Sequence, residues 1–485
     1  MKNKNRILMV ILAICLLTVL PWGKAGAQGN MQINKIDKFI QNNMKNYKIP
    51  GLSVAITYQG KVVFTKGYGQ TSDHQKVTAD TPFAIASLSK AFTALAVIQL
   101  AEAGKLELDR PVITYLPYFK LADPRGDKIT VRHLLQHTSG LTDGVNPDMT
   151  RGEQPKTLSE VISHLQDVSL ASEPGQEYHY HNPNYQILAR LVEVISKEDF
   201  GAYLKRHIFQ PLEMKNTTHV SSTSQLKKLP NFSEGHHYLF GQPLKTNEPD
   251  WFVAGPAGMV STANDMAKWL AFQLNNGNEQ TKQILSANGL KQTHSSIDPK
   301  VNYGLGWNIG KTKDGKQQIS HGGIFWTYKA EAEMLPDDGI GVVVLFNSGL
   351  NSFVDYTSFT RGIAALLMNQ SFSKPISNQW YEIGMGIAIL VTILLGIRTL
   401  MRTKHWNENR KYRAQWKNWF YLSLRFIPLV LLISFSPLLS FIGGGRVLTW
   451  QGIYYTMPSI IILLVTLALI QLIIFIQRLF YLYNK

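Results

Sequence analysis

One helix can be placed from its residues alone: it opens at Pro82-Phe83-Ala84-Ile85-Ala86-Ser87-Leu88-Ser89-Lys90 and continues through the apolar run of residues 91–102. From Ser87 onward, apolar residues recur at helical spacing as far as Gly104, and a glycine is typical just after a helix. Ser87 and Lys90 are three residues apart, so one turn places the amine beside the hydroxyl. This juxtaposition is the chemically informative feature of the stretch.

A serine hydroxyl is a poor nucleophile at neutral pH and needs a neighbouring group to take its proton. A buried lysine with a lowered pKa can be that group, and Lys90 is in the right place to serve Ser87. The first turn of the helix also directs backbone N–H groups at a ligand over Ser87, which suits an oxyanion. The stretch therefore predicts serine acyl-transfer chemistry.

The Ser-x-x-Lys pattern is short and also occurs where no catalysis is expected, at Ser224–Lys227 and Ser371–Lys374. The former pair lies in a polar run and the latter in a Ser/Lys/Pro/Asn connector. Only Ser87–Lys90 opens a long apolar helix. A chance tetrapeptide is the structural alternative, and the helical context favours the functional interpretation.

The chain has 485 residues, enough for a large core with additional segments. Its formal net charge of +16 is concentrated in the first 30 residues and in residues 380–485, whereas the part between them is nearly balanced. A nucleic-acid-binding domain would need a basic face, so no nucleic-acid partner is predicted. Basic residues beside hydrophobic segments indicate membrane orientation instead.

Residues 1–27 resemble a secretory signal, with Lys2, Lys4 and Arg6 before an apolar segment and the small residues Ala25-Gly26-Ala27 at its end. We expect either cleavage after Ala27 or an uncleaved signal anchor. The only cysteine, Cys15, lies in this segment, which excludes a disulfide within the chain and a cysteine-ligated metal site. The residues that follow are therefore expected to be exported.

Residues 31–371 are predicted to form one globular domain with strands near both ends and helices between them. This order indicates an α+β fold, in which an antiparallel sheet is built from early and late segments, flanked by helices, and carries an inserted helical lobe. The expected strands are 52–57, 61–67, 304–309, 317–321, 328–335 and 341–347. The expected helices are 34–48, 87–102, 131–137, 158–166, 185–196, 263–275 and 357–368.

A linker at 372–379 leads into a membrane region at 380–485. About 20 apolar residues cross a bilayer, and three segments are long enough. They are 380–397, 420–442 and 457–476, and the loop 398–419 between the first two is strongly basic. This loop should be cytoplasmic, which places the globular domain outside and the C-terminus in the cytoplasm. Buried helices of a second soluble domain are the alternative, but their length and low polarity argue against it.

Two further motifs could complete a site around Ser87. Tyr180-His181-Asn182 lies on an expected loop, where a phenol could relay a proton and an amide could bind a substrate carbonyl. His321-Gly322-Gly323 lies at an expected strand end, where glycines let a substrate backbone come close. Either motif alone could be a packed tyrosine or a simple turn, and it is their combination with Ser87–Lys90 that indicates a site.

Together these motifs resemble the serine β-lactamase and penicillin-binding-protein superfamily, in the branch around class C β-lactamases with its D-aminopeptidase, carboxypeptidase and esterase relatives. The resemblance covers about residues 31–370. It is supported by the stretches 104–112, 129–141 and 339–347.

The resemblance implies a role for each motif residue. Ser87 would be the acylated nucleophile, and Lys90 and Tyr180 would share general-base and proton-shuttle duty in an order that sequence leaves open. The substrate-binding residues would be Asn182, His321, Gly322 and Gly323. The backbone N–H groups of Ser87 and Ile324 would form the oxyanion hole.

One departure from the family pattern affects the predicted substrate. Class C β-lactamases carry Lys-Thr-Gly where this chain has His-Gly-Gly, and a histidine is largely neutral at pH 7. The difference favours a peptidase or esterase over a strong β-lactamase. No cofactor or metal is predicted, because the close histidine pairs His133/His137 and His179/His181 lack a His-Glu-x-x-His pattern.

The leading hypothesis is a multi-pass, membrane-anchored serine hydrolase with its catalytic domain on the extracytoplasmic side. Its substrate would be a small peptide, an ester or a β-lactam of the cell envelope, and sequence names no protein partner. A slow or inactive sensor module coupled to the membrane helices is a second hypothesis. A transporter with an accessory exported domain is a third, and spans with so few polar residues make it the weakest.

Overall fold

The computed structural model describes residues 22–149, 152–275, 283–296, 301–372, 379–443 and 445–483, with side chains described from Gln32 onward. Most of the expected signal segment 1–27 and of the linker 372–379 therefore lies outside the described residues. Residues 22–27 belong to the backbone of helix α2 (Trp22–Tyr47), which begins well before the expected helix at 34–48.

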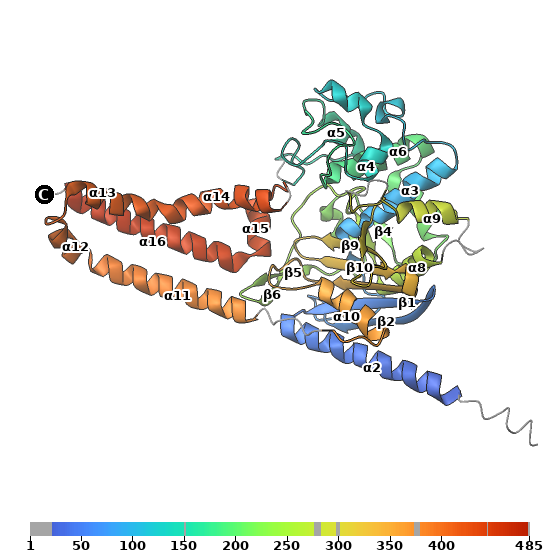
Figure 1. The fold of residues 1–485 in the computed structure, drawn as a ribbon, viewed down its shortest axis with the longest axis horizontal. Helices are drawn as coiled ribbons and strands as arrows, with labels where there is room; N and C mark the ends of the chain where they lie inside the picture. Colours follow the sequence, from blue (N-terminus) through green and yellow to red (C-terminus); the bar gives the residue numbers. More distant parts are fainter. Residues whose placement is uncertain are drawn as a thin grey trace, which may run out of the picture.

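A six-stranded antiparallel sheet in the order β2-β1-β11-β10-β9-β8 is the centre of the globular domain (Figure 1). The early strands β1 and β2 pair with the late strands, which confirms the α+β arrangement expected from the sequence. The strands are β1 (Gly51–Tyr58), β2 (Lys61–Gly69), β8 (Asn308–Lys311), β9 (Gln317–Ile324), β10 (Lys329–Leu335) and β11 (Ile340–Phe346).

Both faces of the sheet are covered, so its central strand β11 is apolar throughout. Val342 and Val344 belong to a cluster that includes α2 and α10 (Thr357–Leu367), whereas Val343 and Leu345 face the larger core with α8 (Ala263–Leu274). Successive strand side chains point to opposite faces, which explains why neighbouring valines enter different cores.

The helical lobe is inserted between the two groups of strands (Figure 1). Its helices include α3 (Lys90–Glu102), α4 (Val131–Leu135), α5 (Leu158–Ser163), α6 (Asn182–Ser196), α7 (Phe200–Leu204) and α9 (Ala287–Thr293). The sequence did not predict two small sheets beside it. They consist of β3 (Phe83–Ala84), β4 (Thr218–His219) and β7 (Met259–Ser261), and of the hairpin β5 (Gly235–Leu239) and β6 (Gln242–Thr246).

The strand expected at 304–309 begins only at Asn308. Gly306 has a positive φ of +83°, and a Cβ there would lie 2.9 Å from the Cα of Ala91. The apolar residues around Gly306 therefore form a turn packed against helix α3 rather than a strand. These residues are apolar because they are buried, and their apolar character suggested a strand at 304–309.

The end of strand β9 packs closely against the turn that carries Ser87. That turn is the 3₁₀ helix η1 (Ala86–Ser89), and Ala86 enters it with a positive φ of 46°. A Cβ on Gly323 would lie 1.9 Å from the backbone oxygen of Ile85. Only glycine allows this approach, so Gly323 sets the distance between β9 and the serine.

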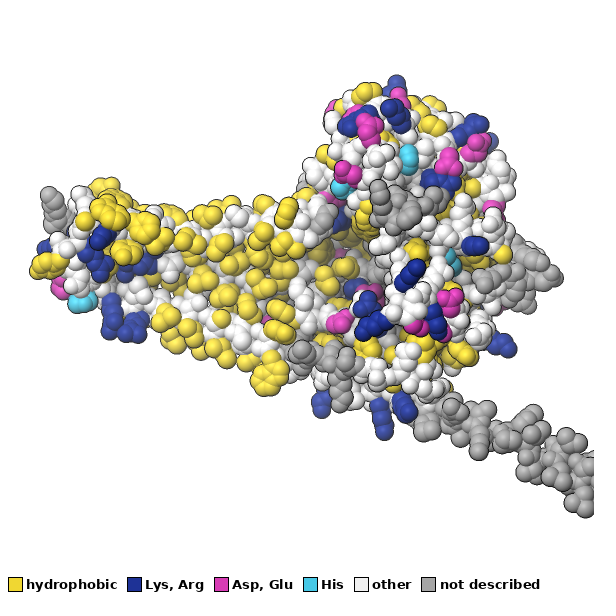
Figure 2. All heavy atoms as spheres, viewed as in Figure 1, with side chains coloured by type: hydrophobic (Ala, Val, Ile, Leu, Met, Phe, Trp, Pro, Cys, Tyr) yellow, Lys and Arg dark blue, Asp and Glu magenta, His cyan; other side chains and the backbone are white. Residues whose placement is uncertain are grey.

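Three C-terminal helices are long and apolar enough to cross a membrane, as expected from the sequence. They are α11 (Gln379–Met401), the continuous helical stretch Gln415–Ile442, and α16 (Pro458–Tyr483). The continuous stretch consists of α13 (Gln415–Ser423), η7 (Leu424–Phe426) and α14 (Ile427–Ile442). The segment between α11 and α13 contains a helix of its own, α12 (Thr403–Arg410). Figure 2 shows hydrophobic side chains along the bundle and basic side chains gathered at the end away from the globular domain.

We expect Gly323→Ala to lower the free energy of unfolding by roughly 1–3 kcal/mol, as other overpacking substitutions do. The added methyl meets the backbone of Ile85, which no side-chain rotation can relieve. Thermal unfolding of the full chain in detergent measures this effect. Gly310→Ala is the matched control on β8, because its Cβ would have no neighbour nearer than 3.7 Å. An equal loss in both variants would contradict the prediction.

Candidate active site

Lys90 is completely buried, and its amine points at Ser87. Its Nζ lies 3.2 Å from the Ser87 Oγ and donates hydrogen bonds to the Asn182 Oδ1 at 2.8 Å and to the backbone oxygen of Pro256 at 3.3 Å. Because η1 runs directly into α3, the spacing of three residues brings the amine beside the hydroxyl, as the sequence predicted. Asn182 and Pro256, which are distant from Lys90 in the chain, contact the amine from its other sides.

Burial lowers the pKa of Lys90 well below its ordinary value, because the charged form loses its hydration. The positive charge of Arg446 lowers this pKa further, and the carboxylate of Asp148 opposes the shift. A lowered pKa favours the neutral amine at neutral pH. Lys90 can then accept a proton from a neighbouring hydroxyl.

Tyr180 lies on the loop before α6, above the same amine. The Lys90 Nζ is 4.7 Å from the centre of the tyrosine ring, and the Tyr180 side chain interacts with the hydroxyl of Ser87. Burial raises the pKa of Tyr180 and so keeps the phenol protonated, although the contact with Ser87 acts in the opposite direction. A protonated phenol in this position can donate or relay a proton.

Asn182 is the first residue of α6, so the expected loop Tyr180-His181-Asn182 ends as a helix begins. Its amide is fully engaged: the Oδ1 accepts from Lys90, and the Nδ2 donates to the Asp148 Oδ2 at 2.6 Å. An amide held at both ends has one orientation. Asn182 therefore fixes the position of the Lys90 amine.

His321 is buried and neutral. Burial lowers its pKa to about 3, and the charge of Lys90 contributes to the shift. Its Nδ1 lies 2.7 Å from the carbonyl oxygen of Gly322, and its Nε2 lies 3.0 Å from the Tyr303 hydroxyl. Because a carbonyl only accepts, the ring proton is on Nδ1, and the phenol donates to Nε2. This histidine offers no positive charge to a substrate.

The end of β9 supplies the remaining predicted residues. Gly322 and Gly323 pair with β10, and the close contact of Gly323 with Ile85 brings the strand end beside Ser87. Ile324 is the last residue of β9, and its side chain is exposed. The structure thus gathers Ser87, Lys90 and all the other sequence-predicted residues into one region.

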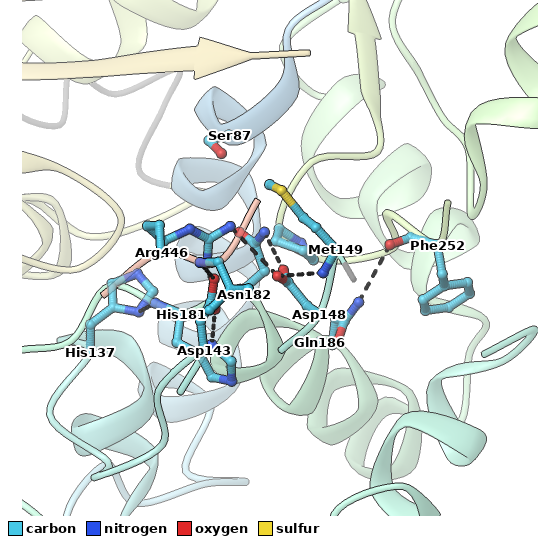
Figure 3. Close-up of polar contacts among 12 residues, drawn as sticks. Ser87, His137, Asp143, Asp148, Met149, His181, Asn182, Gln186, Phe252 and Arg446 are labelled. Atoms are coloured by element: carbon cyan, nitrogen blue, oxygen red, sulfur yellow. Dashed lines mark hydrogen bonds and ion pairs between the residues drawn. The ribbon is translucent and has the colours of Figure 1, made fainter. Parts of the chain in front are cut away.

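Sequence reasoning missed a polar cluster behind these residues (Figure 3). The buried Asp143 Oδ1 lies 2.8 Å from the His181 Nδ1, and Arg446 reaches the same carboxylate from the segment between α14 and α16. Asp148 adds its contact with Asn182. Isolated acids on loops carry no recognisable spacing, and nothing in the sequence links Arg446 to a site some 300 residues earlier.

Aromatic rings enclose the other side of the cluster. The buried His137 accepts a hydrogen bond from the His181 backbone N–H at its Nδ1, at 3.1 Å, so its proton is on Nε2. Its ring packs against four tyrosines, Tyr178, Tyr180, Tyr185 and Tyr303. Within the described part of the chain, no three His, Cys, Asp or Glu side chains gather as a metal site.

The fold is similar to two solved structures. The octameric penicillin-binding protein homologue from Pyrococcus abyssi superposes with a TM-score of 0.61 at 27% identity, over 71% of this chain and 79% of that one. The D-alanine carboxypeptidase AmpC from Burkholderia cenocepacia gives a TM-score of 0.57 at 20% identity, over 70% of this chain and 99% of that one. At this identity the second likeness concerns the fold alone.

A comparison with known protein sequences agrees with this similarity in fold. Protein flp of Staphylococcus aureus strain MW2 is 30% identical over 329 residues, which cover 66% of this chain and 63% of that protein. The chain thus spans somewhat less than two thirds of the length of this relative. The Beta-lactamase family profile matches residues 36–363, which include every motif residue described above. The chain belongs to the β-lactamase family.

Proposed function

We propose that the chain is a membrane-anchored, exported serine hydrolase that forms an acyl-enzyme on Ser87 and acts on a peptide, amide or ester of the cell envelope. One observation carries the proposal: a buried lysine amine with a lowered pKa lies 3.2 Å from the Ser87 hydroxyl. This is the arrangement that turns a serine into a nucleophile.

In the acylation step, the Ser87 Oγ attacks the substrate carbonyl carbon as its proton passes to the Lys90 Nζ. The lowered pKa of Lys90 and the raised pKa of Tyr180 support the amine as the base and the phenol as the protonated relay. The negative carbonyl oxygen is stabilised by the backbone N–H groups of Ser87 and Ile324.

Collapse of this intermediate breaks the bond between the carbonyl carbon and the leaving nitrogen or oxygen. The leaving group takes the proton that Lys90 received, relayed through the Tyr180 hydroxyl, which contacts Ser87. Water then attacks the acyl-enzyme, gives a proton to the restored amine, and frees the acid product and the Ser87 hydroxyl. The same residues therefore serve both halves of the reaction.

The neutral His321 bears on the choice of substrate. With its pKa at about 3 and both ring nitrogens hydrogen-bonded within the protein, it contributes to substrate recognition through shape rather than charge. Gly322 and Gly323 add backbone groups along the strand edge, and the Asn182 amide faces the amine. These features support peptide or ester substrates over β-lactams, whose carboxylate would lack a cationic partner at this position.

The membrane topology follows from the basic segment 398–419, which we place in the cytoplasm. The globular domain and the connector between α14 and α16 then share the outer side. The hydrogen bonds from the connector to Asp143 support this placement, because the two parts can only meet on one side of a bilayer.

A second candidate function is a slow or inactive binding module that senses ligands and reports through the helices. The contact of Arg446 with the acids behind the site favours it, since it joins the membrane region to the site residues. The two functions differ in deacylation. A hydrolase releases product repeatedly, whereas a sensor stays acylated.

Ser87→Ala is expected to abolish covalent labelling by a fluorescent penicillin and by a fluorophosphonate, because the attacking oxygen is gone. Gel fluorescence of the full chain measures labelling, and an unchanged melting temperature shows that the domain remains folded. Ser224→Ala is the matched control, since this serine belongs to the other described Ser-x-x-Lys segment, in η5 (Thr223–Lys228). Labelling that survives in Ser87→Ala would refute the assignment.

The acylation rate should be full above the pKa of Lys90 and fall as the pH drops through that value, because the protonated amine cannot accept the serine proton. Since the pKa is lowered, we expect this acid limb well below about 10.4, the value of a free lysine. Stopped-flow acylation across pH locates it. A limb near the free value would show that the amine is not the base.

Turnover of three substrate classes by one preparation separates the remaining alternatives. We expect a D-amino-acid peptide or a short-chain ester to be turned over faster than a cephalosporin, because His321 is neutral. A single burst of product without turnover for every class would favour the sensor. Fast cephalosporin hydrolysis would contradict the substrate preference.

A further inference from the structure

The connector between the second and third membrane helices leaves the bundle and packs on the globular domain. It contains the short helix α15 (Trp450–Thr456), which lies beside strand β5. A Cβ on Gly452 would lie 2.4 Å from the Trp326 ring, and Ser352 donates two hydrogen bonds to the backbone oxygen of Thr456. Trp326 lies two residues after the end of β9, so the connector contacts the site strand from outside.

Arg446 extends from this connector into the cluster behind the site (Figure 3). Its guanidinium donates to the Asp143 Oδ1 at 2.9 Å and lies 3.6 Å from the Asp148 Oδ1. The backbone N–H of Val447 donates to the other oxygen of Asp143 at 3.0 Å. The guanidinium carbon is also 6.0 Å from the centre of the Tyr180 ring.

The two carboxylates hold the two residues that directly follow Tyr180. Asp143 contacts His181, and Asp148 contacts Asn182, whose amide holds Lys90. Both acids are almost completely buried, with 1% and 9% of their side chains exposed. A planar guanidinium can bind two carboxylates at once in fixed directions, which lysine cannot do. Arg446 thus pairs with both of the carboxylates that hold the predicted catalytic loop Tyr180-His181-Asn182.

Removing this cation would leave two buried negative charges with only neutral partners or a histidine, which is unfavourable in an apolar interior. Several titratable and charged groups face either Arg446 or Lys90. They are Asp143, Asp148, Tyr180, His181, His137, His321 and Tyr185. Loss of the arginine would therefore change both the position of Asn182 and the field at Lys90.

We propose that Arg446 is a positioning residue of the active site, and that this site is shared between the exported domain and the connector of the membrane helices. The proposal rests on the proposed hydrolase function. Its consequence is that the docked connector holds Asp143 and Asp148 in place, which orients Asn182 and the Lys90 amine for proton transfer.

The test uses the full chain in lipid nanodiscs, with Arg446→Ala, Arg446→Lys and the control Lys417→Ala. We expect Arg446→Ala to lower kcat for a short-chain ester about 10- to 100-fold with little change in KM, because misplaced catalytic groups slow the chemical step. Its acid limb should move to higher pH, since a positive charge near Lys90 is gone. Arg446→Lys should recover part of the rate, and Lys417→Ala should match the unchanged chain.

Two outcomes would overturn the proposal: an unchanged kcat and acid limb in Arg446→Ala, or an effect confined to KM. The latter would make Arg446 a direct anchor for substrate. If the unchanged chain itself neither turns over esters nor is acylated, the proposed hydrolase function fails instead. The two failures are therefore distinguishable.

A second measurement does not depend on activity. The amide of Val447 is bonded to Asp143, so its hydrogen exchange should be slow in the full chain and faster in Asp143→Ala. Asp314→Ala, at an exposed and distant acid, is the control. This measurement also covers the case in which Arg446→Ala does not fold. Fast exchange at Val447 in the unchanged chain would show that the connector is not docked and would overturn the proposal.

Discussion

Burial of one lysine amine is the constraint on which the site depends. Lys90 is enclosed by Ser87, Asn182 and the backbone of Pro256, so its ammonium form would have to exist without water. An unhydrated charge is unfavourable, and the amine responds with a lowered pKa. The surrounding acceptors are arranged so that the neutral amine still has polar partners. An amine with a lowered pKa is thereby held at the N-terminal end of an otherwise apolar helix.

The fold meets this constraint by bringing together segments that are far apart in the chain. The sheet joins strands from both ends of the domain, which carries β9 to the turn of Ser87, where Gly323 permits backbone contact. The inserted lobe supplies Asn182 through the first turn of α6. Helix α3, with Phe92 stacked on Trp269 of α8 at 3.8 Å between ring centres, is held rigidly beneath them.

Local patterns made much of this predictable from the sequence. Residue spacing placed Lys90 beside Ser87, and five of the six sheet strands lie close to the ranges expected from the sequence. The strand at 308–311 was misplaced because buried apolar residues around Gly306 look like a strand although they form a turn. The sheet of β3, β4 and β7 was missed because strands of two or three residues are too short to show a period. The hairpin β5–β6, with five residues in each strand, was missed as well.

Arg446 was beyond prediction for a different reason. Its position depends on how the C-terminal helical bundle docks on the globular domain, and that docking depends on shape and on scattered contacts such as Trp326 against Gly452. The roles of Asp143 and Asp148 could not be predicted from the sequence either, since a single acid on a loop belongs to no periodic pattern. Charged residues that come together only through tertiary packing form no local sequence pattern, so their contacts cannot be predicted from the sequence.

The charge balance around the site links these observations to substrate choice. The pKa values of Lys90 and His321 are both lowered, which favours their neutral forms. The positive charge of Arg446 is paired with the carboxylates of Asp143 and Asp148. Nearby, Lys329 forms a buried ion pair with Glu331. Among the described residues, each cationic side chain named here is therefore either paired with an acid or has a pKa lowered by burial. In the proposed mechanism, a substrate carboxylate would find no unpaired cation among these groups, so we expect recognition to depend on the strand edge, the backbone N–H groups proposed for the oxyanion and the fit of the acyl group.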